Sequence, residues 1–150
     1  MDEEKRDSGE VFWGETADGL RLGLSAKGGI AGLYLQNVGN VPLDVMSHIS
    51  THELHLDWYT LQMKNTSGLN RKLCLLDARD RSVAIRIHLE PRESLQHFID
   101  VGEWARRSVN GAKPLAPGSY QLFAVYDVAN EKDCWLGHLN GGNGVRVEIT

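Results

Sequence analysis

The chain has 150 residues, of which 41% are hydrophobic and 24% charged, and its 16 Lys and Arg against 20 Asp and Glu give a net charge of −4. A chain of this length and composition is typical of one globular domain with a substantial core, which excludes a fibrous repeat or a disordered chain. The acidic balance argues against a nucleic-acid-binding surface, because such surfaces concentrate lysine and arginine.

The first ten residues, MDEEKRDSGE, are polar and acidic. They predict a disordered tail over residues 1–10 ahead of a single domain over residues 11–150. They lack the apolar segment of a signal peptide, and no apolar run in the chain approaches the ~20 residues of a membrane helix. We therefore expect a cytoplasmic protein with no membrane segment.

After the tail, short apolar runs alternate with polar residues and are separated about every ten residues by Gly, Pro, Asn or Asp. Leucine occupies every second position of residues 20–25, and valine or isoleucine does so over residues 145–150. A period of two turns one face of a strand toward a core, so the pattern predicts an antiparallel all-β domain. We expect strands near residues 11–14, 19–25, 30–38, 42–47, 53–64, 71–78, 82–89, 94–99, 119–128, 133–139 and 144–150.

One segment, residues 100–107, has a helical pattern instead. Asp100 is a suitable N-cap, Glu103 follows three positions later, and Arg106 and Arg107 close the segment. This arrangement is typical of a capping box with charges that oppose the helix dipole. It predicts one short helical turn.

About ten short strands with one crossover turn favour a two-layer β-sandwich. At the start of one strand, Gly118 precedes Tyr120 by two residues, which is the local pattern of a tyrosine corner. We expect the Tyr120 hydroxyl to bond to the upstream backbone and Gly118 to adopt a positive φ. Leu122 stands where antibody domains have a disulfide cysteine, so packing must hold the layers together.

Four turn signals occur along the chain in a characteristic order. They are Trp13-Gly14 with Gly19-Leu20, Asn37-Val38-Gly39 ahead of Pro42, the segment Glu90-Pro91-Arg92-Glu93-Ser94, and Pro117-Gly118-Ser119-Tyr120. In these features the chain resembles bacterial immunoglobulin-like β-sandwich modules, and the order is similar to that of the small intracellular proteinase-inhibitor domains of bacilli. The resemblance implies an immunoglobulin-like fold. Arg92 stands where the pattern has Gly.

Three histidines, His48, His52 and His55, fall within eight residues. On a helix His48 and His52 share a face and suit a metal ion, whereas on a strand they lie about 13 Å apart, which is too far for one ion. The segment His52-Glu53-Leu54-His55 is one residue shorter than the zinc-protease motif. A metal-dependent enzyme using this cluster and a polar strand edge both remain open.

The two cysteines, Cys74 and Cys134, lie sixty residues apart and do not match a zinc knuckle. They predict either one disulfide or two reduced thiols. The chain has no nucleophile elbow, and its glycine-rich segment over residues 141–144 leads into a strand rather than a phosphate-binding helix. We therefore expect no catalytic residue and no cofactor.

These observations favour a non-catalytic immunoglobulin-like interaction module with a protein partner. Trp104 in the crossover turn and Trp135 near the chain end are the expected surface anchors, together with Arg106 and Arg107. An alternative is a proteinase inhibitor that presents the loop from Ala105 to Pro117. Self-association is a further prediction, because the C-terminal strand over residues 145–150 lacks proline and carries few charges.

Overall fold

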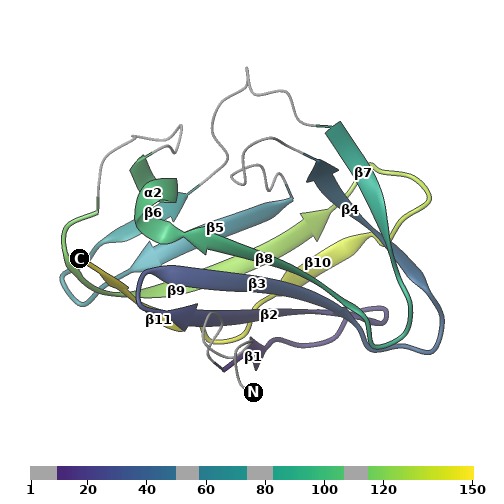
Figure 1. Cartoon of the computed structure of the whole chain (residues 1–150), viewed down its shortest axis with the longest axis horizontal. Helices are drawn as coiled ribbons and strands as arrows, with labels where there is room; N and C mark the ends of the chain where they lie inside the picture. The colour runs from purple at the N-terminus through teal and green to yellow at the C-terminus, as the bar shows by residue number, and fades with distance from the viewer. Residues whose placement is uncertain (1–9, 50–57, 74–82, 107–114) are drawn as a thin grey trace.

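The computed structural model describes residues 10–49, 58–73, 83–106 and 115–150 (Figure 1). These residues form antiparallel strands and one short helix, as the alternating pattern predicts. The elements are β1 (Phe12–Trp13), β2 (Leu20–Lys27), β3 (Ile30–Asn37), β4 (Leu43–Ile49), β5 (Tyr59–Lys64), β6 (Asn70–Leu73), β7 (Val83–Leu89), β8 (Ser94–Asp100), α2 (Val101–Arg106), β9 (Gly118–Val128), β10 (Gly137–Asn140) and β11 (Val145–Ile149).

The strands form two larger sheets and one two-stranded ribbon. Sheet I has the order β1-β2-β3-β8, and sheet II has the order β10-β9-β5-β6 with β11 also paired to β9. The ribbon consists of β4 and β7. Because β2 contacts β9, β10 and β11, sheets I and II pack against each other as two layers. Among the described residues, no helix is long and apolar enough to cross a membrane.

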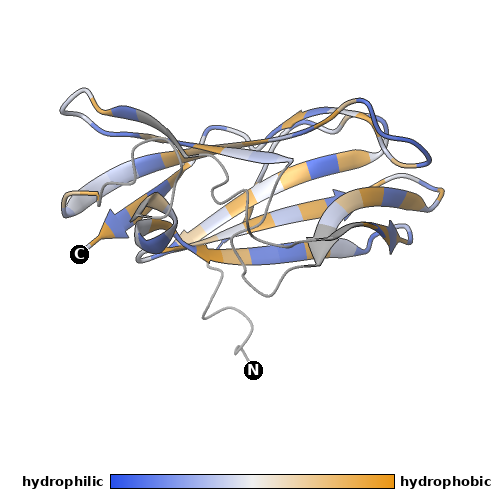
Figure 2. Ribbon diagram, turned by 90° about the horizontal axis from the view of Figure 1, so that it is seen from above, coloured by the Kyte–Doolittle hydropathy of each residue, from blue (hydrophilic) through white to orange (hydrophobic). Residues whose placement is uncertain are grey.

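The core lies between the two sheets and follows the alternation in the sequence, which is visible as alternating colours along the strands in Figure 2. Leu20, Leu22 and Leu24 of β2 are fully buried, and so is Leu122 of β9. Leu139 of β10 is 1% exposed. A buried leucine contributes about 2 kcal/mol through removal of its apolar surface from water. The inward leucines therefore hold the layers together without a disulfide between them.

A single buried asparagine fixes the corner where the β3–β8 pair turns into the β4–β7 ribbon. The Asn37 Nδ2 group donates to the carbonyls of Val41 (2.8 Å) and Leu89 (3.0 Å), and its Oδ1 accepts from the Gly39 amide (2.9 Å). The Asn37 backbone bonds to Glu93 and Arg92 on the neighbouring turn. Every polar atom of this fully buried side chain is thus satisfied, as burial requires.

Arg92, in the same corner, has a φ of +78°. Arg92 therefore has the left-handed conformation that glycine adopts most readily. A side chain with a Cβ is strained there by about 1 kcal/mol. The turn keeps its shape because the Arg92 amide donates to the Asn37 carbonyl (2.7 Å).

The tyrosine corner is confirmed. Tyr120 is 5% exposed and its hydroxyl donates to the Ala116 carbonyl at 2.6 Å. Gly118 has a φ of +146°, which disfavours any residue with a Cβ. This hydrogen bond ties Ala116, which precedes β9, to Tyr120 within β9.

The predicted helical turn is also confirmed. In α2 the Glu103 amide donates to the Asp100 carboxylate (3.2 Å), so Asp100 is the N-cap. The Val101 amide donates to the Gly29 carbonyl (3.0 Å), which ties α2 to the β2–β3 turn. Most other expected strands match within a few residues, except that the strand predicted over residues 133–139 begins only at Gly137. The strands predicted over residues 53–64 and 71–78 are described only as Tyr59–Lys64 and Asn70–Leu73, and their remaining parts lie outside the described residues, apart from Trp58. The predicted tail, apart from Glu10, lies outside the described residues.

Candidate functional site

The two tryptophans expected at the surface are buried, so this prediction is wrong. Trp104 is 0% exposed and Trp135 is 6% exposed. In α2, residues Val101, Trp104 and Ala105 share one face, and that face packs into the core. The Trp135 ring packs against Tyr126, and its Nε1 donates to the Ala17 carbonyl (3.1 Å). Both indoles stabilise the fold and neither is available to a partner.

The other residues singled out by sequence are placed only in part. His52, His55 and Arg107 lie outside the described residues, as do the side chains of His48 and Arg106. The His48 backbone belongs to β4, opposite Ala84 of β7. In the described part of the chain, no group of three His, Cys, Asp or Glu residues is placed to hold a metal ion.

A histidine outside the predicted cluster lies between two carboxylates. The His88 imidazole is 2.8 Å from Asp44 through Nδ1 and 2.8 Å from Glu90 through Nε2. These hydrogen bonds raise the pKa of His88, and the bond to Glu90 has the larger effect. Because both ring nitrogens are engaged, the imidazole acts as an ionic link between β4 and β7 rather than as a general base.

Cys134 has a free thiol near this histidine link. Its burial, together with the charge of Glu131, raises the pKa of the thiol. A raised pKa keeps the sulfur protonated and a poor nucleophile at neutral pH. The surroundings of Cys134 therefore suit a packed thiol, as the sequence predicts for a reduced cysteine.

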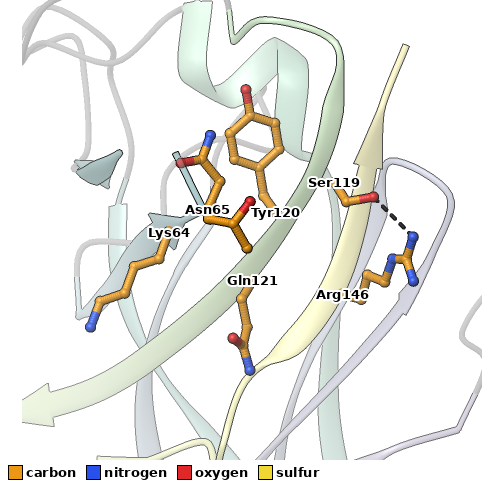
Figure 3. Close-up of a pocket in the computed structure, with 7 residues that line it drawn as sticks. Lys64, Asn65, Ser119, Tyr120, Gln121 and Arg146 are labelled. Carbon is orange, nitrogen blue, oxygen red and sulfur yellow. Dashed lines mark hydrogen bonds between the residues drawn. The ribbon is translucent and has the colours of Figure 1, made fainter. Parts of the chain in front are cut away.

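A depression of about 500 Å³ lies beside the tyrosine corner, between the end of β5 and strands β9 and β11 (Figure 3). Two cations line it, but both already have partners. The Arg146 guanidinium donates to Glu148 (2.6 Å) and Ser119 (3.0 Å), and the Lys64 ammonium lies 5.1 Å from the Phe123 ring centroid. We interpret this depression as part of the structural support of the Tyr120 corner.

The outer face of sheet I has a different character. We call Trp13, Ile30, Tyr34 and Phe98 the aromatic face. The Trp13 and Tyr34 rings lie 6.1 Å apart, and the Tyr34 and Phe98 rings 6.0 Å apart. The Trp13 ring lies against Gly23, and the Tyr34 side chain lies against Gly32. A Cβ at Gly23 would be 2.7 Å from the Trp13 ring, and one at Gly32 would be 2.8 Å from the Tyr34 hydroxyl.

Two residues of the aromatic face are exposed, whereas Tyr34 is only 4% exposed. Ile30 is 37% exposed and Phe98 is 39% exposed. In the register of sheet I, Ile30 pairs with Lys27 on one side and with Asp100 on the other. At this end of β3 the face therefore carries one cation on the β2 side and one carboxylate on the β8 side. Sequence reasoning missed it because its residues come from three separate segments.

Neither a scan against models of protein families nor a search of curated proteins finds a match to this chain. The resemblance to bacterial immunoglobulin-like modules and to proteinase-inhibitor domains stays a hypothesis.

Proposed function

We propose that the protein is a non-catalytic interaction module with an immunoglobulin-like sandwich, and that its aromatic face binds a protein partner. The tyrosine corner and the two packed antiparallel sheets support this type of sandwich. The observation that carries the functional proposal is the exposure of Ile30 and Phe98 beside each other on one sheet face. Adjacent exposed apolar side chains are typical of interaction surfaces.

The partner that the charges fit best is a second copy of this chain. A two-fold axis parallel to the strands, above β3, brings the β2 edge of one copy over the β8 edge of the other. Lys27 of each copy then faces Asp100 of its partner, and the two Ile30 side chains meet at the axis. Opposite charges at matching positions favour this pairing over a shifted one.

The expected affinity is low. Strands β2, β3 and β8 are seven or eight residues long, whereas β1 has only two residues, so with strands about 4.8 Å apart the footprint is at most roughly 19 by 26 Å. This footprint is at the small end of specific interfaces. We therefore expect a dissociation constant of about 10–100 µM.

Sedimentation velocity from about 1 to 200 µM tests this proposal. Wild type should shift toward the dimer with concentration, and Phe98→Ser should weaken association at least tenfold. Lys27→Glu places two carboxylates opposite each other and should weaken it similarly. Adding Asp100→Asn to Lys27→Glu should restore part of the association, because asparagine removes the repulsion and still caps α2.

Lys64→Glu is the matched control, since it makes the same charge reversal on sheet II. Its association should equal that of wild type. A wild-type chain that stays monomeric at the highest concentration overturns the second-copy proposal. So does a dimer that Lys64→Glu disrupts and Lys27→Glu does not.

A further inference from the structure

A cavity of about 600 Å³ lies at the edge of the sandwich where β1 meets the β10–β11 turn. One wall is the segment from Trp13 to Ala17, and the other includes His138, Asn140 and Asn143. The cavity shares only Trp13 with the aromatic face. It belongs to neither the tyrosine corner nor the histidine link.

The cavity has a rigid frame because two backbone segments touch behind it. The Gly14 amide donates to the Leu22 carbonyl (2.9 Å), and a Cβ on Gly14 would lie 1.8 Å from the Asn140 carbonyl oxygen. On the opposite wall, Gly142 has a φ of +84° and its Cβ position is 3.4 Å from the Trp13 carbonyl oxygen. Glycine is thus required on both sides of the contact. The backbone behind the cavity is therefore closely packed, whereas the polar side chains of Glu15, Thr16, Asn140 and Asn143 are exposed.

The polar side chains of the cavity keep their hydrogen-bonding capacity. Glu15, Thr16, Asn140 and Asn143 make no side-chain hydrogen bond to another described residue. The His138 Nδ1 atom forms a long ion pair with the Asp127 carboxylate at 3.7 Å, which is beyond hydrogen-bond distance. Carboxamides, a hydroxyl and an imidazole each donate and accept hydrogen bonds, and the carboxylate accepts.

The chemical groups that line the cavity indicate which class of ligand it suits. Of the described residues that line the cavity, none is Lys or Arg, and Glu15 repels anions. A phosphate or carboxylate ligand would therefore lack a counter-charge. Hydroxyl groups, which donate and accept in the same way as the lining groups, match them best. Trp13 also lines the cavity, but the Arg21 guanidinium lies 4.0 Å from the centroid of its ring, so the proposed ligand is held by hydrogen bonds rather than by stacking on this indole.

We propose that this cavity binds a neutral carbohydrate. The Glu15 carboxylate accepts hydrogen bonds from sugar hydroxyls, and the Asn140 and Asn143 carboxamides bond to hydroxyls from the opposite wall. This binding is independent of the partner at the aromatic face. A single sugar unit in an open cavity binds weakly, with a dissociation constant of about 1–10 mM.

Titration of ¹⁵N-labelled protein with neutral sugars, followed by two-dimensional amide NMR, tests the proposal. The probes are glucose, galactose, mannose, N-acetylglucosamine and a disaccharide of each. At least one should produce saturable shifts at the amides of residues 14–16 and 140–143. Glu15→Ala and Asn140→Ala should each weaken binding about tenfold. Gln96→Ala, on the exposed outer face of sheet I, should leave it unchanged.

Glucuronate and glucose 6-phosphate distinguish charge from shape, and both should bind more weakly than glucose. Asn143→Ala replaces Asn140→Ala if the latter loses its dispersed spectrum. The proposal is overturned if no probe gives saturable shifts at those amides up to about 100 mM. It is also overturned if glucose 6-phosphate binds more tightly than the neutral sugars. The same holds if Glu15→Ala and the asparagine variant that is tested both bind sugar as tightly as wild type.

Discussion

The outer faces of the two sheets differ although both come from the same alternating sequence pattern. On sheet II most outward residues are polar and several bond to one another, as Arg146, Glu148 and Ser119 do. The outward Phe123 ring of this sheet has the Lys64 ammonium 5.1 Å from its centroid. On sheet I the outward residues include aromatic rings that lie against Gly23 and Gly32. Water forms hydrogen bonds with a polar outer face, whereas burial of an exposed aromatic face against a partner is favourable because it removes apolar surface from water. This difference is the basis of the proposal that the outer face of sheet I binds a partner.

The largest effect is expected where a ring lies against a glycine. A valine at Gly32 would place its Cβ 2.6 Å from the Ser25 hydroxyl oxygen and 2.8 Å from that of Tyr34. Gly32→Val should therefore displace the Tyr34 ring and lower the free energy of unfolding by about 3 kcal/mol. Gln121→Val, on the exposed outer face of β9, is the control. It removes only the exposed hydrogen bond from the Gln121 carboxamide to the Asn143 carbonyl and should lower the free energy of unfolding by no more than about 1 kcal/mol. Urea melts measure both, and equal effects would contradict the contrast between the faces.

The tyrosine corner tests how much sheet II depends on one hydroxyl. Tyr120→Phe removes the donor to the Ala116 carbonyl and should lower the free energy of unfolding by about 1–2 kcal/mol. Gly118→Val should cost at least as much, because the φ of +146° penalises a β-branched residue. Urea denaturation compares both variants with wild type. A neutral Tyr120→Phe would remove the corner as a support of the immunoglobulin-like assignment.

A smaller change in the opposite direction is expected at the corner between sheet I and the ribbon. Arg92→Gly should raise the free energy of unfolding by about 0.5 kcal/mol, since relief of the strain exceeds the added entropy of the unfolded chain. Arg92→Lys keeps the Cβ and should leave the stability unchanged. Thermal melts of both variants decide the point. A lower melting temperature for Arg92→Gly would show that the arginine side chain matters more than its backbone strain.

Two histidines are expected to change the stability of the fold with opposite dependence on pH. Burial lowers the pKa of His97, on the inner side of β8, so its contribution to stability is present above pH 6.5 and is lost as the pH falls toward the lowered value. The pKa of His88 is raised, so its contribution is present below pH 6.5 and is lost as the pH rises through the raised value. Unfolding measured from pH 5 to 8 should lose its acid-side decline in His97→Gln but keep it in His88→Gln. The same decline in both variants would contradict the assignment to His97.

Local features of the fold follow from the sequence alone. Alternation of period two and turn residues predict the strands, because backbone conformation and the choice of a buried face depend on neighbouring residues. The same holds for the Asp100 cap and for Gly118 with Tyr120, where the interacting atoms are at most four residues apart. Arg92 shows that a residue with a Cβ keeps a positive φ when the surrounding bonds hold its backbone.

Tertiary structure alone decided which residues meet across the sheets. His88 bonds to Asp44 forty-four residues away, and Gly32 lies opposite Phe98 through the register of β3 and β8. Trp104 and Trp135 are buried because the core accepts their rings, whereas alternation predicts only that some face is apolar. The cavity beside Trp13 likewise depends on the close approach of Gly14 to Asn140. Local propensity determines the conformation of each segment, but contacts between distant segments depend on how the strands pair and pack.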